Sequence, residues 1–321
     1  MSIRPLLVLA ALLFSGTLAA QTYPAKPVRL IIPFTAGGLT DVLGRGIASE
    51  LNKIWSHPML VENRPGANQI IGAEALAKSP PDGHTLLVAD KAPLTLNPHL
   101  YSKLPYDAAR DFAPVLNLVH TTNILVASPG FAPNSLQELI ALARTQPGAI
   151  NYGSFGLGSS THLDTEAFAS QIGIRLNHIP YKGIAEVLPA IVSGQIQIAI
   201  SGIPPALGLI RQGRIKAIAL TGAQRSRLLP DLPTAVEAGA PSLESVSWFG
   251  LFAPAGTPQP LIERIAADVG RVISAPEFQE KFISGVGLEL LNQPAEQFAE
   301  RIRADREKGA ARVKNVNVKL D

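Results

Sequence analysis

VRLIIPFTAGGLTDVLGR, residues 28–45, decides the fold that we expect for this chain. An apolar run typical of a strand covered on both faces enters a glycine-rich turn, and a helical stripe that includes Leu43, Ile47 and Leu51 follows. The same pattern returns in INYGSFGLGSSTH, residues 150–162. A helix start offers unpaired N–H groups and the positive end of the helix dipole to an anion. Two such loops predict one anionic ligand held from two sides.

Glycine and hydroxyl residues give each loop its expected chemistry. Gly37 and Gly38 let the backbone approach a ligand, and Thr40 is the expected N-cap of the following helix. In the second loop Gly156 and Gly158 take the same part, beside hydroxyls from residues 159–161. A turn without any ligand also uses glycine, so each loop taken singly fits a purely structural role as well. Neither loop has the spacing of a dinucleotide or P-loop signature.

The first twenty residues have the pattern of an export signal. Arg4 supplies the positive end, residues 6–14 are apolar, and Ala19 or Ala20 ends a small-residue cleavage zone. The sequence contains no cysteine, which excludes a cysteine-linked lipid anchor and disulfides. We therefore expect a periplasmic protein that is not inserted in a membrane. The formal net charge of +3 comes without a basic run, so nucleic acid is not an expected partner.

Alternating apolar runs and helical stripes predict an α/β protein with parallel strands. The expected strands are 28–32, 85–89, 124–127, 196–200, 216–220 and 248–252. The expected helices are 41–54, 67–78, 135–145, 162–171, 184–193, 204–212, 258–274 and 295–310. Roughly 300 residues favour two lobes over one core. We expect the first lobe at 22–122 plus 226–321 and the second at 123–225.

Residues for metal binding or covalent catalysis have no supporting pattern. Six histidines are scattered without cysteine or an H-E-x-x-H motif, so neither a metal nor a cofactor is expected. His162 and Glu166 have helical i, i+4 spacing, but a histidine at a helix start fits a capping or ligand-facing donor better. No G-x-S-x-G elbow occurs. A secreted hydrolase that uses Ser160 and His162 is the weakest of three functional hypotheses.

Beyond these patterns, the chain resembles the extracytoplasmic solute-binding receptors of the tripartite tricarboxylate transporters, also called the Bug family. The resemblance covers essentially the whole mature chain in the family's order. The stretches that carry it are YPAKPVRLIIPFTAGGLTDVLGR (23–45), VENRPGANQIIGAEALAKSPPDGHTLLV (61–88), NPHLYSKLPYDAARDFAPV (97–115), NYGSFGLGSSTHL (151–163), HIPYKGIAEVLPAIVSGQIQ (178–197) and LPDLPTAVEAGAPSLESVSWFGLFAPAGTP (229–258).

This resemblance implies a type II periplasmic-binding-protein fold, in which two α/β lobes on a two-strand hinge close over a small carboxylate. It implies ligand contacts from the loops at 33–41 and 153–162 and from the helix start at 181–185, whereas Arg64 ties down a turn. The predicted ligand-binding residues are Phe34, Thr35, Ala36, Gly37, Gly38, Thr40, Asp41, Asn68, Lys91, Ser154, Phe155, Gly156, Leu157, Gly158, Ser159, Ser160, Thr161, His162, Gly183, Ile184, Ala185, Ser201, Gly202 and Ile203.

Several positions depart from the family pattern. Asn68 and Gln69 stand where relatives usually have glycines, and residues 89–93 replace a run that is usually small and hydroxylated. Ser201 and Gly202 occupy a site that is often acidic or amidic, which disfavours an amino-acid ligand. The apolar residues that could form a slot for an aromatic ring are Phe34, Phe155, Leu157 and Ile203.

Charged residues of the 89–93 segment bear on the ligand as well. Lys91 either reaches a second carboxylate of the ligand or points to solvent, and Asp90 is either neutralised by Lys91 or free. The expected ligand is an aromatic or otherwise bulky apolar carboxylate, in preference to an amino acid. With Lys91 in the slot it is a dicarboxylate such as a phthalate isomer.

The leading functional hypothesis is a monomeric, non-enzymatic receptor that delivers an organic carboxylate to membrane permease subunits of a tripartite tricarboxylate transporter. The second is an orphan receptor of the same fold that signals the ligand to a sensor kinase. These two share the pocket and differ in the partner.

Overall fold

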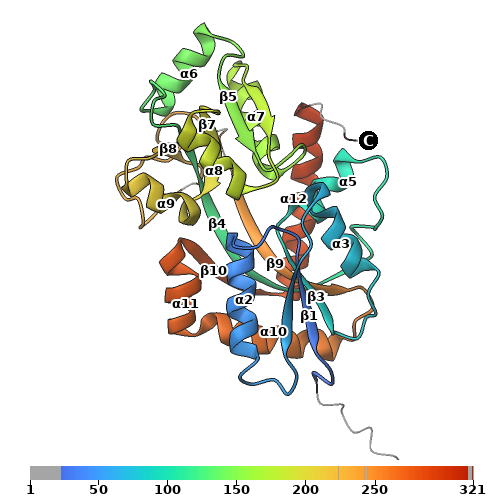
Figure 1. Cartoon of the computed structure of the whole chain (residues 1–321). Helices are drawn as coiled ribbons and strands as arrows, with labels where there is room; N and C mark the ends of the chain where they lie inside the picture. Colours follow the sequence, from blue (N-terminus) through green and yellow to red (C-terminus); the bar gives the residue numbers. More distant parts are fainter. Residues whose placement is uncertain (1–22, 223, 242, 244, 317–319, 321) are drawn as a thin grey trace, which may run out of the picture.

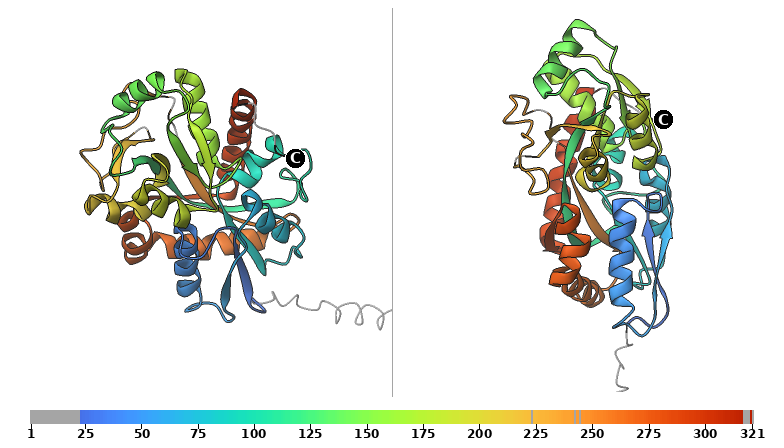
Figure 2. Two further views of the ribbon diagram at one scale, coloured as in Figure 1. Left: turned by 45° about the horizontal axis from the view of Figure 1, so that its top comes forward. Right: turned by 60° about the vertical axis from the view of Figure 1, so that its left-hand side comes forward.

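The computed structural model describes residues 23–222, 224–241, 243, 245–316 and 320. The export signal predicted at residues 1–20 lies outside the described residues. Figures 1 and 2 show two α/β halves, with long strands running from one half into the other. No helix among the described residues has both the length and the apolar character that crossing a bilayer requires.

The strands form one path of paired neighbours, in the order β2-β1-β3-β9-β4-β7-β5-β6, with β10 and β8 also paired to β4. The strands are β1 Val28–Ile32, β2 Met59–Asn63, β3 Thr85–Ala89, β4 Phe112–Ala127, β5 Asn151–Ser154, β6 Asn177–Pro180, β7 Ile198–Gly202, β8 Lys216–Leu220, β9 Val246–Pro254 and β10 Leu288–Pro294. The first lobe has the parallel set β2, β1 and β3, and the second has β6, β5 and β7. Their carboxyl ends, where binding sites of open α/β sheets usually lie, carry the loops predicted to bind the ligand.

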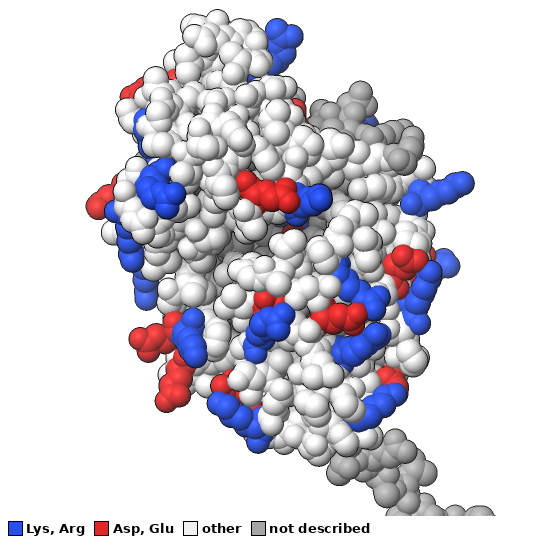
Figure 3. All heavy atoms as spheres, in the orientation of Figure 1, with Lys and Arg blue, Asp and Glu red and all other residues white. Residues whose placement is uncertain are grey.

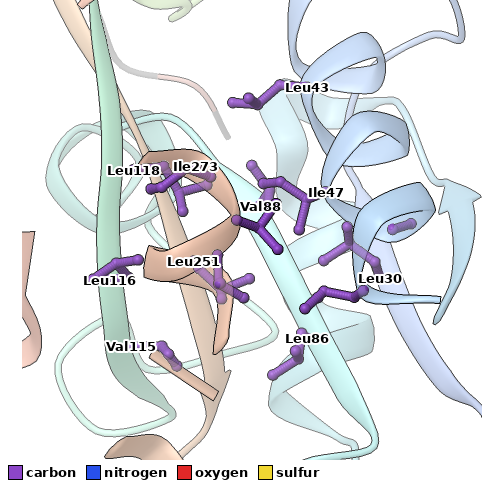
Figure 4. Close-up of a cluster of buried hydrophobic side chains, with 14 of the residues drawn as sticks. Leu30, Leu43, Ile47, Leu86, Val88, Val115, Leu116, Leu118, Leu251 and Ile273 are labelled. Atoms are coloured by element: carbon purple, nitrogen blue, oxygen red, sulfur yellow. The ribbon is translucent and has the colours of Figure 1, made fainter. Parts of the chain in front are cut away.

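Helices cover the sheets of both lobes (Figure 1). They are α2 Leu39–Leu51, α3 Ile70–Ala77, α4 Ala92–Thr95, α5 Asn97–Leu100, α6 Leu136–Thr145, α7 Ser160–Ile172, α8 Ile184–Ser193, α9 Ile203–Arg211, α10 Gln259–Ser274, α11 Pro276–Phe282 and α12 Ala295–Val316, with short 3-10 turns η1 Ala67–Gln69 and η2 Ser284–Val286. In the first lobe the apolar stripe of α2 packs on β1 and β3. Figure 4 shows this contact, in which Leu43 and Ile47 of the helix meet Leu30 and Val88 of the strands.

Two chain crossings join the lobes. β4 pairs with β9 in the first lobe as far as Thr122 and with β7 and β8 in the second lobe from Asn123 onward. The segment before β9 runs beside β4 at this point, where Asn123 Nδ2 donates to Ser245 Oγ at 3.0 Å. The Thr221 hydroxyl lies within hydrogen-bond distance of two carbonyls, at 2.9 Å from that of Asn123 and 2.7 Å from that of Ser245. These bonds tie the crossing segments together at the hinge.

The lobe limits inferred from the sequence remain a prediction. A set of residues beyond 226 packs into the second core with Leu125 and Ile218: Ala235, Ala238, Ala240 and Leu243. We therefore propose that the second crossing lies near Val246 and not at 226, because these apolar side chains lose their exposed surface against the second lobe.

The predicted helices and strands are all present, with changes at their ends. The predicted helix 67–78 is interrupted, because Ala67, Asn68 and Gln69 adopt left-handed backbone angles before α3 begins. The predicted strand 124–127 is the last quarter of β4, and α12 continues to Val316 instead of ending at 310. Strands β2, β6 and β10 were not predicted, because each is partly exposed and none is apolar along its whole length.

Candidate functional site

A cavity of about 550 Å³ lies between the lobes and is lined from both sides. Figure 3 shows the molecule hollowed between its upper and lower halves, with uncharged atoms around most of the hollow. The two walls are close: a Cβ added at Gly183 of the second lobe would lie 3.7 Å from Thr35 Oγ1 of the first. The volume lies within the range that drug-sized ligands occupy.

Four helices begin at this cavity: α2 from the first lobe and α7, α8 and α9 from the second. Their N-cap residues, Gly38, Ser159, Gly183 and Gly202, all line it. Only Ser159 caps its helix with a side chain. The positive ends of four helix dipoles therefore meet around one space, which favours an anion there.

The second-lobe loop uses part of its own polar groups to hold its shape. Phe155 N–H donates to Thr161 Oγ1, Gly156 N–H to Ser154 Oγ, and Gly158 N–H to His162 Nδ1. These amides are therefore not available to a ligand. Among the described residues, the N–H groups of Leu157, Ser160 and Thr161 have no hydrogen-bond partner.

Two stacked imidazoles support this loop from below. The His162 and His178 rings lie 4.1 Å apart at 16°, and His178 Nε2 lies 2.6 Å from Ser154 Oγ. Burial, together with the neighbouring His178, lowers the pKa of His162 to about 4, and burial lowers the pKa of His178 to about 4. Both rings are therefore neutral at pH 7, and His162 acts inside the loop and not as a ligand-facing donor.

Asp41 holds the first-lobe loop. Its carboxylate accepts bonds from Gly37 N–H at 2.9 Å, from Asn63 Nδ2 at 2.9 Å and from Arg45 Nε at 3.0 Å. Burial raises the pKa of this carboxyl, but the hydrogen bonds from Arg45, Gly37 and Asn63 outweigh it and hold the pKa below its ordinary value. Asp41 does not line the cavity, and its carboxylate serves the loop instead of the ligand.

The left-handed segment Ala67–Gln69 connects the lobes. Asn68 Nδ2 donates to Gly158 O of the second lobe at 3.1 Å and to Asn97 Oδ1 at 2.6 Å. Asn97 Nδ2 in turn donates to the Asn68 carbonyl. The structure thus gives Asn68 a bridging position at the edge of the cavity.

Of the neighbouring residues Asp90 and Lys91, the aspartate lines the cavity and the lysine does not. A site for a second carboxylate of the ligand would need the reverse. Lys91 Nζ donates to the Val246 carbonyl at 3.0 Å, and the side chain does not line the cavity. Asp90 lines the cavity, and its Oδ1 accepts from Gln69 Nε2 and Ala92 N–H. Burial raises the pKa of Asp90 against these two lowering hydrogen bonds. The proposed contact of Lys91 with a second carboxylate has no support in this geometry.

An apolar wall faces the helix starts. Phe34 and Phe249 meet edge to face, with ring centroids 6.4 Å apart, and Phe155 and Leu157 line the opposite side. Ile203, the fourth member of the predicted slot, is 1% exposed inside the second core and does not line the cavity. Pro205 of the same helix lines the cavity.

The cavity brings together much of the predicted set. The predicted residues that line it are Phe34, Thr35, Gly38, Thr40, Asn68, Phe155, Gly156, Leu157, Ser159, Ser160, Thr161, Gly183, Ile184 and Gly202. Those that do not line it are Ala36, Gly37, Asp41, Lys91, Ser154, Gly158, His162, Ala185, Ser201 and Ile203. Contact of the first group with a ligand stays a prediction. Ser154 and Ser201 are fully buried and donate to nearby backbone carbonyls, of Gly156 and Gly202.

Several lining residues were not predicted. Tyr101, Thr121, Asn123, Ser247 and Phe249 complete the floor and the walls of the cavity. Thr121 and Asn123 come from the crossing strand β4, and Ser247 and Phe249 from β9. A signal was present in the sequence, because HTTN at 120–123 interrupts an otherwise apolar strand at the hinge.

The geometry gives no support to the hydrolase hypothesis. Ser160 Oγ has no hydrogen-bond partner among the described residues, and the His162 Nδ1 that would activate it is occupied by Gly158 N–H. The close pair of Ser154 and His178 lies under the loop and outside the cavity. The described part of the chain also has no group of three His, Asp or Glu side chains placed to hold a metal ion.

Comparisons with known proteins agree with this arrangement. Residues 43–318 match the family model described as the tripartite tricarboxylate transporter family receptor. The chain is 35% identical to BugT of Bordetella pertussis over 269 residues, which cover 84% of this chain and 82% of BugT. The structure of R. palustris Rpa4515 with adipate superposes with a TM-score of 0.88 at 31% identity, covering 92% and 99% of the two chains.

A second solved structure, MatC of Rhodopseudomonas palustris with bound malate, has a TM-score of 0.84 at 28% identity and covers 91% and 100% of the chains. These similarities extend over nearly the whole of each protein, and the two-lobe α/β architecture is that of periplasmic binding proteins. The chain belongs to the receptor family of the tripartite tricarboxylate transporters.

Proposed function

We propose that this protein is a non-enzymatic periplasmic receptor that captures an organic carboxylate and delivers it to the membrane subunits of a tripartite tricarboxylate-type transporter. The observation that carries the proposal is the convergence of four helix starts, from both lobes, on one cavity. A carboxylate there gains hydrogen bonds from unpaired amides and a favourable interaction with the dipoles. Rpa4515 and MatC, whose structures contain adipate and malate, support a carboxylate as the ligand class.

The apolar wall favours a ligand with a ring-sized apolar body. Phe34, Phe155 and Phe249 offer faces and edges to a ring, and such contacts contribute about 1 kcal/mol beyond the burial of apolar area. An aromatic acid fits this wall. Lys91, the cation expected for the second carboxylate of a phthalate isomer, is instead bonded to the Val246 carbonyl.

Calorimetry with matched ligands tests the proposal. Benzoate and benzamide have nearly the same shape, but only benzoate carries the charge that the helix starts favour. We expect 1:1 binding of benzoate, no measurable binding of benzamide, and binding of adipate as a flexible carboxylate. Neutral compounds that bind as well as the acids, or a complete lack of response to carboxylates, would refute the proposal.

Co-purification tests the delivery step. The receptor loaded with carboxylate should associate with the large membrane subunit of a tripartite tricarboxylate transporter reconstituted in nanodiscs, and the ligand-free receptor should associate more weakly. A periplasmic sensor domain that binds the loaded receptor while the transporter does not would favour the signalling hypothesis.

A further inference from the structure

Asp90 is the only acidic residue among the described side chains that line the cavity. It follows β3, at the end of the sheet that forms the floor. Its Oδ1 accepts from Gln69 Nε2 at 2.7 Å and from Ala92 N–H at 2.8 Å. Within the described residues, Oδ2 makes no hydrogen bond. One oxygen of this carboxylate is therefore fixed and the other is free to accept.

Gln69 adds a second acceptor beside this carboxylate. The residue is 6% exposed, and its Oε1 has no hydrogen-bond partner among the described residues. A buried acceptor without a partner costs about 1–3 kcal/mol. Ser247 Oγ, also at the cavity, is likewise buried and without a partner in the described part of the chain. Both residues line the cavity, but these two oxygens are buried behind its surface, so the acceptor that is open to a ligand here is Asp90 Oδ2.

The backbone holds Gln69 in place at some cost. Ala67, Asn68 and Gln69 have φ values of 45°, 49° and 70°, and each left-handed non-glycine residue costs about 1–2 kcal/mol. Asn68 fixes this run through its bonds to Asn97 and Gly158. Strain of this kind persists where the surrounding structure determines it and is concentrated at binding sites. It places the Gln69 amide against Asp90.

No basic side chain of the described residues pairs with Asp90. Lys91, next in sequence, donates to the Val246 carbonyl, and Lys182, the basic residue that lines the cavity, is exposed to solvent. Asp164, whose charge also raises the pKa of Asp90, is paired with Arg312. A carboxylate that loses its water when a ligand fills the cavity is costly unless a cation pairs with it, so the ligand itself is the available source of that cation.

We propose that Asp90 and Gln69 form a subsite for an ammonium group, so that the ligand is a carboxylate whose far end carries a protonated amine. This inference rests on the proposed function, because the helix starts hold the carboxylate end. An ammonium donates to carboxylate oxygens, and Asp90 Oδ2 is the acceptor without a bond at the cavity, while the Gln69 amide holds Asp90 Oδ1 in place. A second carboxylate would instead meet a like charge. The ligand preference expected from Ser201 and Gly202 is therefore reversed by Asp90.

Calorimetry at pH 8 with four para-substituted benzoates tests the subsite. The ligands are 4-(aminomethyl)benzoate, 4-(hydroxymethyl)benzoate, 4-methylbenzoate and terephthalate. We expect the amine to bind at least tenfold more tightly than the methyl compound, with the alcohol between them and terephthalate weakest. The trio 6-aminohexanoate, hexanoate and adipate repeats the comparison on a flexible body.

Two variants assign the effect to the carboxylate. Asp90→Asn keeps the shape and an acceptor for Gln69, and it should abolish the advantage of the amine while 4-methylbenzoate binds as before or more tightly. Lys91→Met is the matched control, because Lys91 is next to Asp90 in the sequence but does not line the cavity, and this variant should keep the advantage.

The outcomes separate the two proposals. Equal affinities of the amine and methyl compounds, tightest binding of terephthalate, or an amine advantage that survives Asp90→Asn would each overturn the subsite while carboxylate binding stands. A lack of binding by every acid in both series would refute the proposed function and the subsite together.

Discussion

Gly158→Ala, compared with a control at another left-handed glycine, measures how much tight packing around the second-lobe loop adds to the cost of backbone strain. Gly158 has φ +74°, and an added Cβ would lie 2.6 Å from Leu320 Cδ1 and 2.9 Å from Leu100 Cδ1. The left-handed conformation costs alanine about 1 kcal/mol. Overpacking adds about 1–3 kcal/mol because both leucine ends must move. We expect the free energy of unfolding to fall by about 2–4 kcal/mol.

Gly148→Ala is the matched control. Gly148 has φ +80°, and a Cβ there would have no neighbour within 4 Å, so only the backbone cost of about 1 kcal/mol applies. Urea unfolding gives the two free energies, and calorimetry with benzoate gives the affinities. Gly158→Ala should also weaken benzoate binding about tenfold, because displaced leucines alter the loop that Asn68 bridges. Equal stability losses with unchanged affinity in both variants would refute this reasoning.

Three further predictions concern buried charge. Asp41→Asn should lower the free energy of unfolding by about 2 kcal/mol at pH 7. Because the pKa of Asp41 is lowered in the fold, wild type should lose this advantage as the pH falls below about 4. Urea unfolding at pH 7 and pH 3.5 checks both expectations, and an equal difference at the two pH values contradicts the assignment. For His162 and His178, whose pKa values are lowered to about 4, the neutral rings stabilise the fold fully above about pH 6.5 and lose this contribution as the pH falls toward 4. The loss should be on the order of 3 kcal/mol for each ring. The pH dependence of the urea midpoints should therefore shrink in His178→Gln, and it should stay unchanged if the rings are not buried. Arg312→Met leaves the Asp164 carboxylate, which is 1% exposed, without its cation and should lower the free energy of unfolding by about 3 kcal/mol. The double variant Arg312→Met with Asp164→Leu should regain most of this free energy. A double variant as unstable as the single one would show that the ion pair is not the cause.

Much of the architecture follows from local sequence signals. The continuous apolar run of β1 and the stripe of α2 predict a strand, a turn and a helix with the correct limits to within a few residues. The same logic fails for β6, whose four residues are all partly exposed or exposed. It also fails for β10, whose pairing with β4 is set by the distant chain and not by its own pattern. Tertiary pairing outweighs local preference in such strands.

The sequence predicted the cavity-lining residues in the glycine loops at the helix starts. It did not predict the lining residues of the floor, which come from strands β4 and β9. Asp41 and His162 have the residue types of ligand-binding groups, but their polar atoms are used by the loops that carry them. Asp90 and Lys91 are adjacent, and successive residues at a strand end point to opposite sides. Sequence alone does not say which of the two enters the cavity. The structure places Asp90 there and directs Lys91 to the Val246 carbonyl.

The dissociation constant of benzoate for Ser160→Pro, compared with Ser160→Ala, tests the central claim most directly. Ser160 is the first residue of α7, where proline is well tolerated, and the extended ψ of 158° at Ser159 suits a following proline. Both variants lose the hydroxyl, but only proline removes the N–H that we expect to donate to the carboxylate. A charge-assisted hydrogen bond contributes about 1.5–3 kcal/mol, so Ser160→Pro should bind benzoate roughly 10- to 100-fold more weakly than Ser160→Ala at similar stability. Equal dissociation constants for the two variants would contradict the claim that the start of α7 holds the carboxylate.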